Sequence, residues 1–260
     1  MQTVFKDYKT FNEDISGWDV GRVTYMDKMF ANAIAFNQDI SAWDMGKVTY
    51  TGEMFWNATA FNQDISAWNV SSVTSMYRMF ATASSFNQNI SAWNMGKVTD
   101  TRGMFNGAIA FNQDISAWNV GKVTSMDNMF GAAAAFNQDI SAWNVSSVTD
   151  MNYMFNGAKA FNQDISAWNV GKVTKLAMMF WGAKAFNQDI SGWNLTSVTD
   201  MSSMFFSASK FNQNLCAWGK FIPSPNISIG GMFTSSNCTN KNIPTSSTGP
   251  FCAVTTCPSP

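Results

Sequence analysis

The sequence contains no histidine among its 260 residues. Histidine is the usual general base in enzymes and the commonest metal-binding side chain in proteins. Its absence excludes every serine–histidine and cysteine–histidine arrangement for nucleophilic catalysis. We therefore expect no catalytic residues and a protein that is not an enzyme.

Long apolar runs and a strong net charge are also missing. No segment approaches the roughly 20 apolar residues of a membrane-spanning helix, and the opening MQTVFKDYKT lacks the apolar centre of a signal peptide. The formal net charge is −1 at pH 7, which provides no general attraction to nucleic acid or to an anionic membrane surface. We expect neither nucleic-acid binding nor membrane insertion. If the protein is secreted, the chain is expected to be a mature form or a fragment.

Cysteine is absent from most of the chain and appears only in its last fifth. The irregular spacing, within a segment rich in Pro, Ser and Thr, favours two disulfides in one of three pairings over a zinc site. Disulfides are typical of oxidising compartments, so a secreted or cell-surface protein is expected. The four cysteines are Cys216, Cys238, Cys252 and Cys257.

One ten-residue phrase recurs every 25 residues. FNQDISAWNV begins at Phe111, and it belongs to the 25-residue consensus FNQDISAWNVGKVTDMxxMFxxAxx. A fixed period without insertions predicts a solenoid, in which equivalent residues stack about 5 Å apart and eight or so coils form a rod on the order of 40 Å long. The N-terminus begins partway through a unit. The same phrase or a close variant starts at Phe11, Phe36, Phe61, Phe86, Phe136, Phe161, Phe186 and Phe211.

Two hydrophobic periods are visible within each unit. The stretch Asn112 to Val120 has the composition of a strand, whereas the second half of the unit has apolar residues at helical spacing. The prediction is an α/β solenoid of the leucine-rich-repeat type, with a parallel strand ladder and one short helix or turn per coil; a parallel β-helix is the alternative. The helical positions are Val123, Met126, Met129, Phe130 and Ala133.

The regular pattern ends at Trp218, which predicts a division of the chain into two parts. Residues 1–218 form about nine repeats, and residues 219–260 shift to Pro, Ser, Thr, Asn and Cys. The last coil of a solenoid would otherwise expose its core to water. We therefore expect residues 219–260 to be a disulfide-pinned cap or tail.

The repeat word, FNQDISAWNV followed by VTDMxxMFxxA, closely resembles the BspA-like leucine-rich-repeat surface proteins, in the branch first noted as a mycoplasma repeat of unknown function. The resemblance covers residues 1 to about 218. It implies a secreted or surface-anchored solenoid used in adhesion and recognition, and it brings no catalytic residues. The sequence shows no sorting signal or anchor of the wall-attached members.

The tryptophan column poses the sharpest question about ligands. In a straight strand, Trp118 would share a face with Asn112 and Asp114, a combination suited to sugar binding. A corner at Ala117 would instead turn Ile115 and Trp118 inward, and a row of exposed tryptophans is rare in soluble monomers. Core packing is favoured and an exposed strip is the alternative. That strip would comprise Trp68, Trp93, Trp118, Trp143 and Trp168.

An acidic column repeats with the same period. Like charges about 5 Å apart repel by about 1 kcal/mol or more, so bound calcium or hydrogen bonds from backbone amides must offset the repulsion. Asn replaces Asp at positions 89 and 214, which favours turn capping over calcium. We expect no cofactor, with calcium as the weaker reading. The candidate ligands are Asp39, Asp64, Asp114, Asp139, Asp164 and Asp189.

Two further polar columns are invariant. The column from Asn12 to Asn212 predicts side-chain amides that bond one coil to the next. The threonine column, Thr24 to Thr199, is interpreted as a series of helix N-caps. Ice-binding solenoids present two threonine ranks, and only one is evident here, so ice binding is a minor alternative.

Six sequons would carry N-linked sugars if the source organism glycosylates the protein and the sites face water. Three of them occupy the same position in their units, and positions that vary between units mark the outer surface. Trp56 and Trp181 share one such variable position and are candidate contact residues. The sequon asparagines are Asn57, Asn69, Asn144, Asn194, Asn226 and Asn237.

These observations predict a non-enzymatic, secreted or cell-surface repeat protein that mediates adhesion or recognition through its long regular face. The expected partners are other extracellular proteins, glycans or copies of the chain itself. A structural subunit of an extracellular filament or matrix is the second hypothesis. Carbohydrate, calcium or ice binding by a repeated side-chain ladder is the third.

Overall fold

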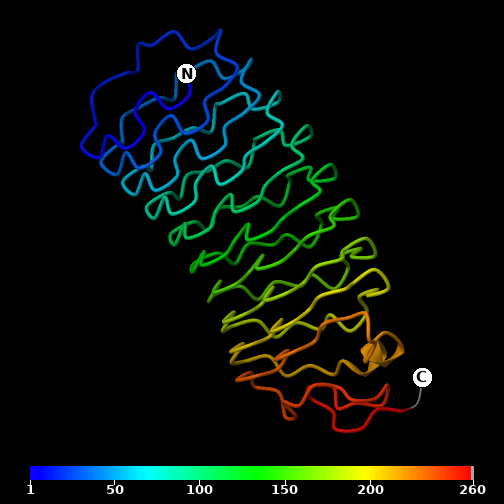
Figure 1. Cartoon of the computed structure of the whole chain (residues 1–260). Coiled ribbons are helices and arrows are strands. Elements are labelled where there is room, and N and C mark those ends of the chain that lie inside the picture. Colours follow the sequence, from blue (N-terminus) through cyan, green and yellow to red (C-terminus); the bar gives the residue numbers. More distant parts are fainter. Residues whose placement is uncertain (259–260) are drawn as a thin grey trace.

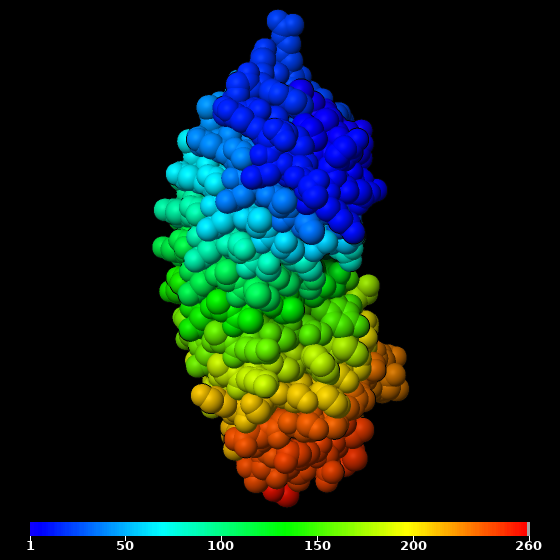
Figure 2. All heavy atoms as spheres, turned by 90° about the vertical axis from the view of Figure 1, so that its left-hand side faces the viewer, coloured from blue at the N-terminus to red at the C-terminus, as the bar shows by residue number. Residues whose placement is uncertain are grey.

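The computed structural model describes residues 1–258 and consists of a straight stack of coils, one per 25-residue unit (Figure 1). The N- and C-terminal segments lie at opposite ends of an elongated rod, and successive coils form parallel bands across its surface (Figure 2). Single parallel β-bridges join neighbouring coils from Tyr25↔Tyr50 to Asp200↔Ser228. The predicted 25-residue repeat and its solenoid-like stacking are confirmed. We call this stack the solenoid.

The short helix predicted in each unit is wrong, because a chain of tight turns takes its place. Within residues 1–258 the only helix is the 3₁₀ helix η1 (Cys216–Lys220). In the unit at 126–133, the amides of Met129, Gly131 and Ala133 bond three residues back, at 3.1 Å each. The intervening amides reach forward instead; Phe130 N–H, for example, bonds Met154 O at 2.9 Å.

Left-handed residues explain why this stretch does not form a helix. Asn128 and Ala132 have φ of 56° and 52°, and the equivalent pair recurs in every coil. A residue at positive φ interrupts a right-handed helix. Half of the amides therefore bond within the coil and half bond the next coil, so the backbone stays satisfied. Turns spaced three and four residues apart still direct Met126, Met129 and Phe130 inward, which is why the sequence has helical periodicity.

The strand predicted between Asn112 and Val120 is also absent, and side chains join the coils there. The Asn112 side-chain oxygen accepts the backbone N–H of Asn137 at 2.9 Å, and Gln138 Nε2 donates to Asn112 O at 2.9 Å. The same pair of bonds repeats in each unit, so the predicted asparagine ladder between coils is confirmed. Because these bonds use side chains, neighbouring coils pair without a continuous backbone ladder, and neither the leucine-rich-repeat strand nor a regular β-helix strand forms.

A corner at Ser116-Ala117 directs two large side chains inward. Trp118 N–H bonds Ile115 O at 3.1 Å to close the turn, and both side chains are buried. The same carbonyl also accepts the indole N–H of Trp143, in the next coil, at 3.1 Å. The predicted corner is confirmed, and the tryptophans from Trp43 to Trp193 each bond their coil to the preceding one.

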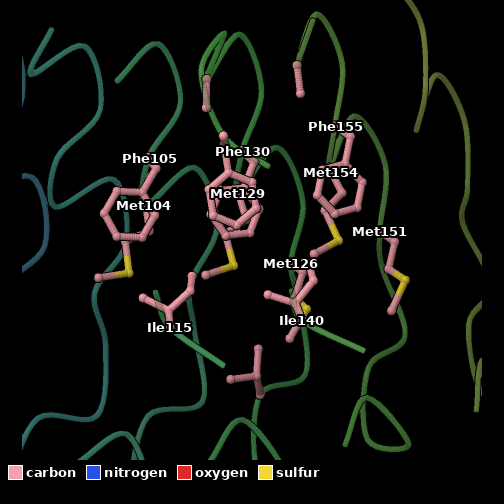
Figure 3. Close-up of a cluster of buried hydrophobic side chains, with 14 of the residues drawn as sticks. Met104, Phe105, Ile115, Met126, Met129, Phe130, Ile140, Met151, Met154 and Phe155 are labelled. Atoms are coloured by element: carbon pink, nitrogen blue, oxygen red, sulfur yellow. The ribbon is translucent and has the colours of Figure 1, made fainter. Parts of the chain in front are cut away.

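Stacking of identical side chains forms one continuous core along the rod. Figure 3 shows a section of it, with Phe, Met and Ile side chains repeating from coil to coil. The Phe105 and Phe130 rings stack at 5.7 Å between centroids, and the Trp118 and Trp143 rings stack at 6.4 Å. An isolated coil would leave these faces in water, so stability depends on contacts between neighbouring coils.

The stacking continues past Trp218 into the C-terminal segment. Phe233 stacks on Phe205 at 6.0 Å, although 28 residues rather than 25 separate them. Two disulfides, Cys216–Cys257 and Cys238–Cys252, tie this last irregular coil to the residues that cover it. The prediction of two disulfides is confirmed, and the structure selects this pairing from the three.

Candidate functional site: the outer surface of the solenoid

The tryptophans proposed as a ligand strip lie in the core, so an exposed aromatic strip is wrong. The corner before each ring turns it inward, and each indole N–H is already bonded to a carbonyl of the preceding coil. The first member of the column, Trp18, has no coil in front of it in the structure and is 38% exposed. Each of the five proposed residues, Trp68, Trp93, Trp118, Trp143 and Trp168, is only 3% exposed.

The aspartate column is exposed and caps the corner turns. Asp114 Oδ1 accepts the backbone N–H of Ser116 at 2.9 Å, and Asn89 makes the equivalent bond to Ser91 at 3.0 Å. That amide, followed by the Ser116 side chain, lowers the pKa of Asp114. Neighbouring carboxylates act in the opposite direction, as Asp14 does on the pKa of Asp39, and their effect is the smaller one.

The same turn bond recurs along the whole column. The turn bonds are present at all six proposed calcium ligands, and residues 1–258 contain no group of three or more acidic, cysteine or histidine side chains placed to hold an ion. Turn capping, the favoured reading, is therefore what the geometry shows. The six residues are Asp39, Asp64, Asp114, Asp139, Asp164 and Asp189.

The threonine column does not cap helices, and that interpretation is wrong. Thr124 donates both its backbone N–H, at 3.0 Å, and its hydroxyl, at 3.3 Å, to Thr99 O of the preceding coil. The repeat keeps threonine here because one residue can make both bonds between coils.

The sequon asparagines fall into two groups. Asn69, Asn144 and Asn194 are exposed at equivalent turns, and Asn226 and Asn237 are exposed near the C-terminal end. Asn57 is half-buried, and its side-chain nitrogen donates to Asn32 Oδ1 at 2.9 Å. A sugar on that nitrogen would have to fit into a half-buried contact between coils, so only the exposed five have the accessibility that glycosylation requires.

The two variable tryptophans differ in exposure. Trp181 is 39% exposed and stacks on Phe206 at 5.9 Å, whereas Trp56 is half-buried. They lie five coils apart and form separate features of the surface.

A hollow in the described surface lies over the first coils, and sequence reasoning missed it. It is a groove of about 410 Å³. Two exposed tyrosines, Tyr25 and Tyr50, stack at 5.4 Å on one side, and Gly52 leaves space where most other units carry a side chain. Tyr77 and Arg102 line the other side. Two tyrosines 25 residues apart beside a glycine were the signal available in the sequence.

The family description "Mycoplasma protein of unknown function, DUF285" matches residues 1–93, 63–160 and 136–246. The chain belongs to this family. The three overlapping matches cover nearly all of the solenoid and reach into the C-terminal segment, as expected for one repeat copied in register. A comparison with curated proteins finds no significant match.

Two features of this DUF285 protein concern its cellular compartment. Its two disulfides indicate an extracytoplasmic, oxidising environment. Within residues 1–258, no helix has the length and apolar character needed to cross a bilayer.

Proposed function

We propose that this DUF285 protein is a non-enzymatic recognition module of the extracellular space or cell surface, which binds partners through one long face of the solenoid. Its partners are extracellular proteins, glycans or further copies of the chain. The scaffold is rigid because each coil is bonded to both neighbours and the core is continuous. Rigid scaffolds that carry variable surface residues are suited to binding.

The observation that carries the proposal is the contrast between constant and variable columns. The inward Phe, Trp and Ile columns and the Asn and Thr columns between coils hardly change along the chain. The bridge column, which is outward-facing, changes chemical character at almost every coil. Its members are Tyr25, Tyr50, Ser75, Asp100, Ser125, Asp150, Lys175, Asp200 and Ser228. This column and its flanks form the face that we propose to be used.

The resemblance of the repeat to BspA-like leucine-rich-repeat surface proteins supports the same function. The resemblance implies a secreted or surface-anchored solenoid used in adhesion, and the two disulfides are consistent with a location outside the cytoplasm. The resemblance concerns the repeat word and its function; the coils themselves lack the strand and helix of a leucine-rich repeat.

A filament or matrix subunit is the second candidate, favoured by the near-identity of the coils, which would allow periodic contacts. The C-terminal segment argues against end-to-end stacking, because Thr239 and Ala253 donate backbone N–H groups to Asn212 and Gln213 of the last regular coil. Light scattering after gel filtration separates the two functions. A mass of 28.7 kDa that is independent of concentration supports the recognition module, and concentration-dependent growth supports the filament.

The binding function is tested with a face-neutralised variant. Tyr25, Tyr50, Asp100, Asp150 and Lys175 are changed to Ser, the residue that the bridge column already carries at three positions. The wild-type chain and the variant are assayed by biolayer interferometry against immobilised mucin, fibronectin and fibrinogen, and by labelling of intact bacterial and cultured animal cells.

A matched control carries the same number of conservative changes on another exposed column. It replaces the acidic corner residues by Asn, which the chain itself uses at the same turn. We expect the control to bind as the wild type does and the face-neutralised variant to lose binding. Absence of binding to every surface, or equal binding by both variants, contradicts the proposal. The control substitutions are at Asp39, Asp64, Asp114, Asp139 and Asp164.

A further inference from the structure

We propose that the groove beside Tyr50 binds one ring of a neutral saccharide. This inference rests on the proposed recognition function and specifies a ligand class and a location for it. The groove volume, about 410 Å³, lies in the range of small-molecule sites, roughly 300–1,000 Å³. It is confined to the first coils, shown in blue and cyan in Figure 1.

An interrupted aromatic stack provides the platform for the ring. Tyr25 and Tyr50 occupy consecutive positions of the bridge column, and their rings stack at 5.4 Å with an interplanar angle of 19°. The next member is Ser75, which carries no ring, so the stack stops at Tyr50. A ligand ring lying over Ser75 would extend the stack by one position. The two tyrosines are 46% and 43% exposed and are therefore accessible from solvent.

The floor and far side of the groove leave room for such a ring. Gly52 has no side chain at a position where neighbouring coils carry Asp27 and Tyr77. The Tyr77 ring is already occupied, because the guanidinium groups of Arg78 and Arg102 lie 5.2 Å and 5.1 Å from its centroid. Tyr77 thus forms a fixed wall, and Tyr50 is the stacking surface.

The charges around the groove favour a neutral ligand that is rich in hydroxyl groups. Arg102 binds Asp100 through two hydrogen bonds of 2.9 Å and 2.8 Å, and Lys28 lies 3.7 Å from Glu53. The two cations that line the groove, Lys28 and Arg102, already have an anionic partner, so an anionic ligand would have to compete with a carboxylate. The carboxylate oxygens and N–H groups together offer both acceptors and donors to hydroxyls.

A pyranose ring combines the two properties that the groove requires. One face carries C–H bonds, which pack on the electron-rich face of an aromatic ring such as Tyr50. The ring edge carries hydroxyls, which would reach Asp100, Arg102 and Glu53 at the rim. The rest of an oligosaccharide would extend into solvent along the open groove.

The test uses the full chain and defined probes. Binding is measured by isothermal titration calorimetry with cellohexaose, laminarihexaose, mannohexaose, xylohexaose and chitohexaose. A heparin hexasaccharide serves as the anionic probe, and N-acetyl-tyrosine amide serves as the aromatic peptide probe. We expect at least one neutral hexasaccharide to bind and both of the other probes to fail.

Two pairs of variants locate the binding. Tyr50→Ala removes the platform, and Tyr50→Phe retains it. Gly52→Tyr fills the groove without backbone strain, because an added Cβ would make only an ordinary 3.5 Å contact with the Tyr77 carbonyl oxygen. Ser202→Tyr places the same side chain at the equivalent position six coils away. Circular dichroism and thermal unfolding verify that each variant is folded.

The expected pattern is a loss of affinity of more than about tenfold for Tyr50→Ala and Gly52→Tyr, with Tyr50→Phe and Ser202→Tyr within about twofold of the wild type. The inference is overturned if no neutral hexasaccharide binds, if binding survives both disruptive changes, or if heparin or the tyrosine amide binds better. The two proposals can fail separately. If no hexasaccharide binds, but the wild type binds mucin, fibronectin, fibrinogen or cells and the face-neutralised variant does not, the saccharide proposal is refuted and the recognition function is retained.

Discussion

Replacement of Trp118 by Ala tests whether the coils share one continuous core. The Trp118 ring is 3% exposed and stacks between Phe105, at 6.2 Å, and Trp143, at 6.4 Å. Removal of a buried tryptophan costs about 3–5 kcal/mol in lost transfer free energy and residual cavity. The indole N–H also donates to Ile90 O at 3.0 Å.

The lost hydrogen bond adds a smaller amount. Ile90 O keeps a second donor, the backbone N–H of Trp93 at 3.1 Å, so it is not left unpaired. The loss of the indole bond then costs about 1 kcal/mol. The total decrease in the free energy of unfolding is about 4–6 kcal/mol, a large part of the roughly 5–15 kcal/mol typical of whole domains.

Guanidinium unfolding followed by far-UV circular dichroism measures this loss, and native-state hydrogen exchange shows where it acts. Because coils contact only their neighbours, exchange should rise first in the coils next to Trp118. Trp118→Phe should cost about 2 kcal/mol, since it keeps the ring stack and loses the indole bond.

Trp18→Ala is the matched control at the open end of the same column. The Trp18 ring is 38% exposed, and solvent can fill the space that it leaves. We expect a loss of about 1–2 kcal/mol, the transfer term for a partly buried ring. Equal losses for Trp18→Ala and Trp118→Ala would refute the reasoning, because they would mean that the column is not an interior feature of the rod.

Three further predictions concern the corners and the C-terminal coil. The hydrogen bond from the Ser116 backbone amide is the largest influence on the pKa of Asp114 and lowers it from the ordinary value of 3.8. The ionised Asp114 side chain therefore contributes its full stabilisation above pH 3.8, and this stabilisation is lost as the pH falls through the lowered pKa. An acid unfolding titration of Asp114→Asn should therefore show a weaker decline below pH 3.8 than the wild type, and parallel curves would contradict the assignment. The double variant Cys238→Ser/Cys252→Ser opens a loop of 14 residues, which should cost about 3 kcal/mol and raise hydrogen exchange in the last coils alone; faster exchange throughout the rod would count against a local cap. A Cβ at Gly219 would overlap a backbone carbonyl oxygen, whereas one at Gly192 would touch nothing, so Gly219→Ala should lower the thermal midpoint by the equivalent of about 1–3 kcal/mol and Gly192→Ala should leave it unchanged. A similar shift for both alanine variants would show that the packing around the last coil is looser than described.

Those features that depend on the period alone could be predicted from the sequence. The 25-residue spacing of Trp118 and Trp143 identifies a stack, and the interval between Ile115 and Trp118 identifies a corner. The replacement of Asp by Asn at position 89 similarly indicates a turn bond, since both side chains accept from an amide.

The backbone conformation could not be predicted in the same way. Turns spaced three and four residues apart place Met126 and Met129 inward just as a helix would, so the hydrophobic pattern does not distinguish the two. The distinguishing feature is the positive φ of Asn128 and Ala132, and neither residue signals it reliably. Glycine does mark the two positions in another unit, as Gly103 and Gly107, and only a comparison between units would have used that signal.

The groove also escaped prediction, for a different physical reason. It arises from side chains that are 25 residues apart in sequence and adjacent in space, and it depends on what is small as much as on what is large. Gly52 and Ser75 create the space, and Tyr50 gives it a surface. The pattern within a single unit therefore does not indicate the groove.

In the chain of turns of each coil, about half of the amides bond within the coil and half bond the next one, which has a consequence for how such proteins change length. The internal junctions share the same asparagine and threonine bonds and the same core stacking, so a complete unit can be removed or duplicated while these contacts are kept. The separation between the two ends then changes in steps of about 5 Å. The length of the rod is thus set by the number of copies of the unit.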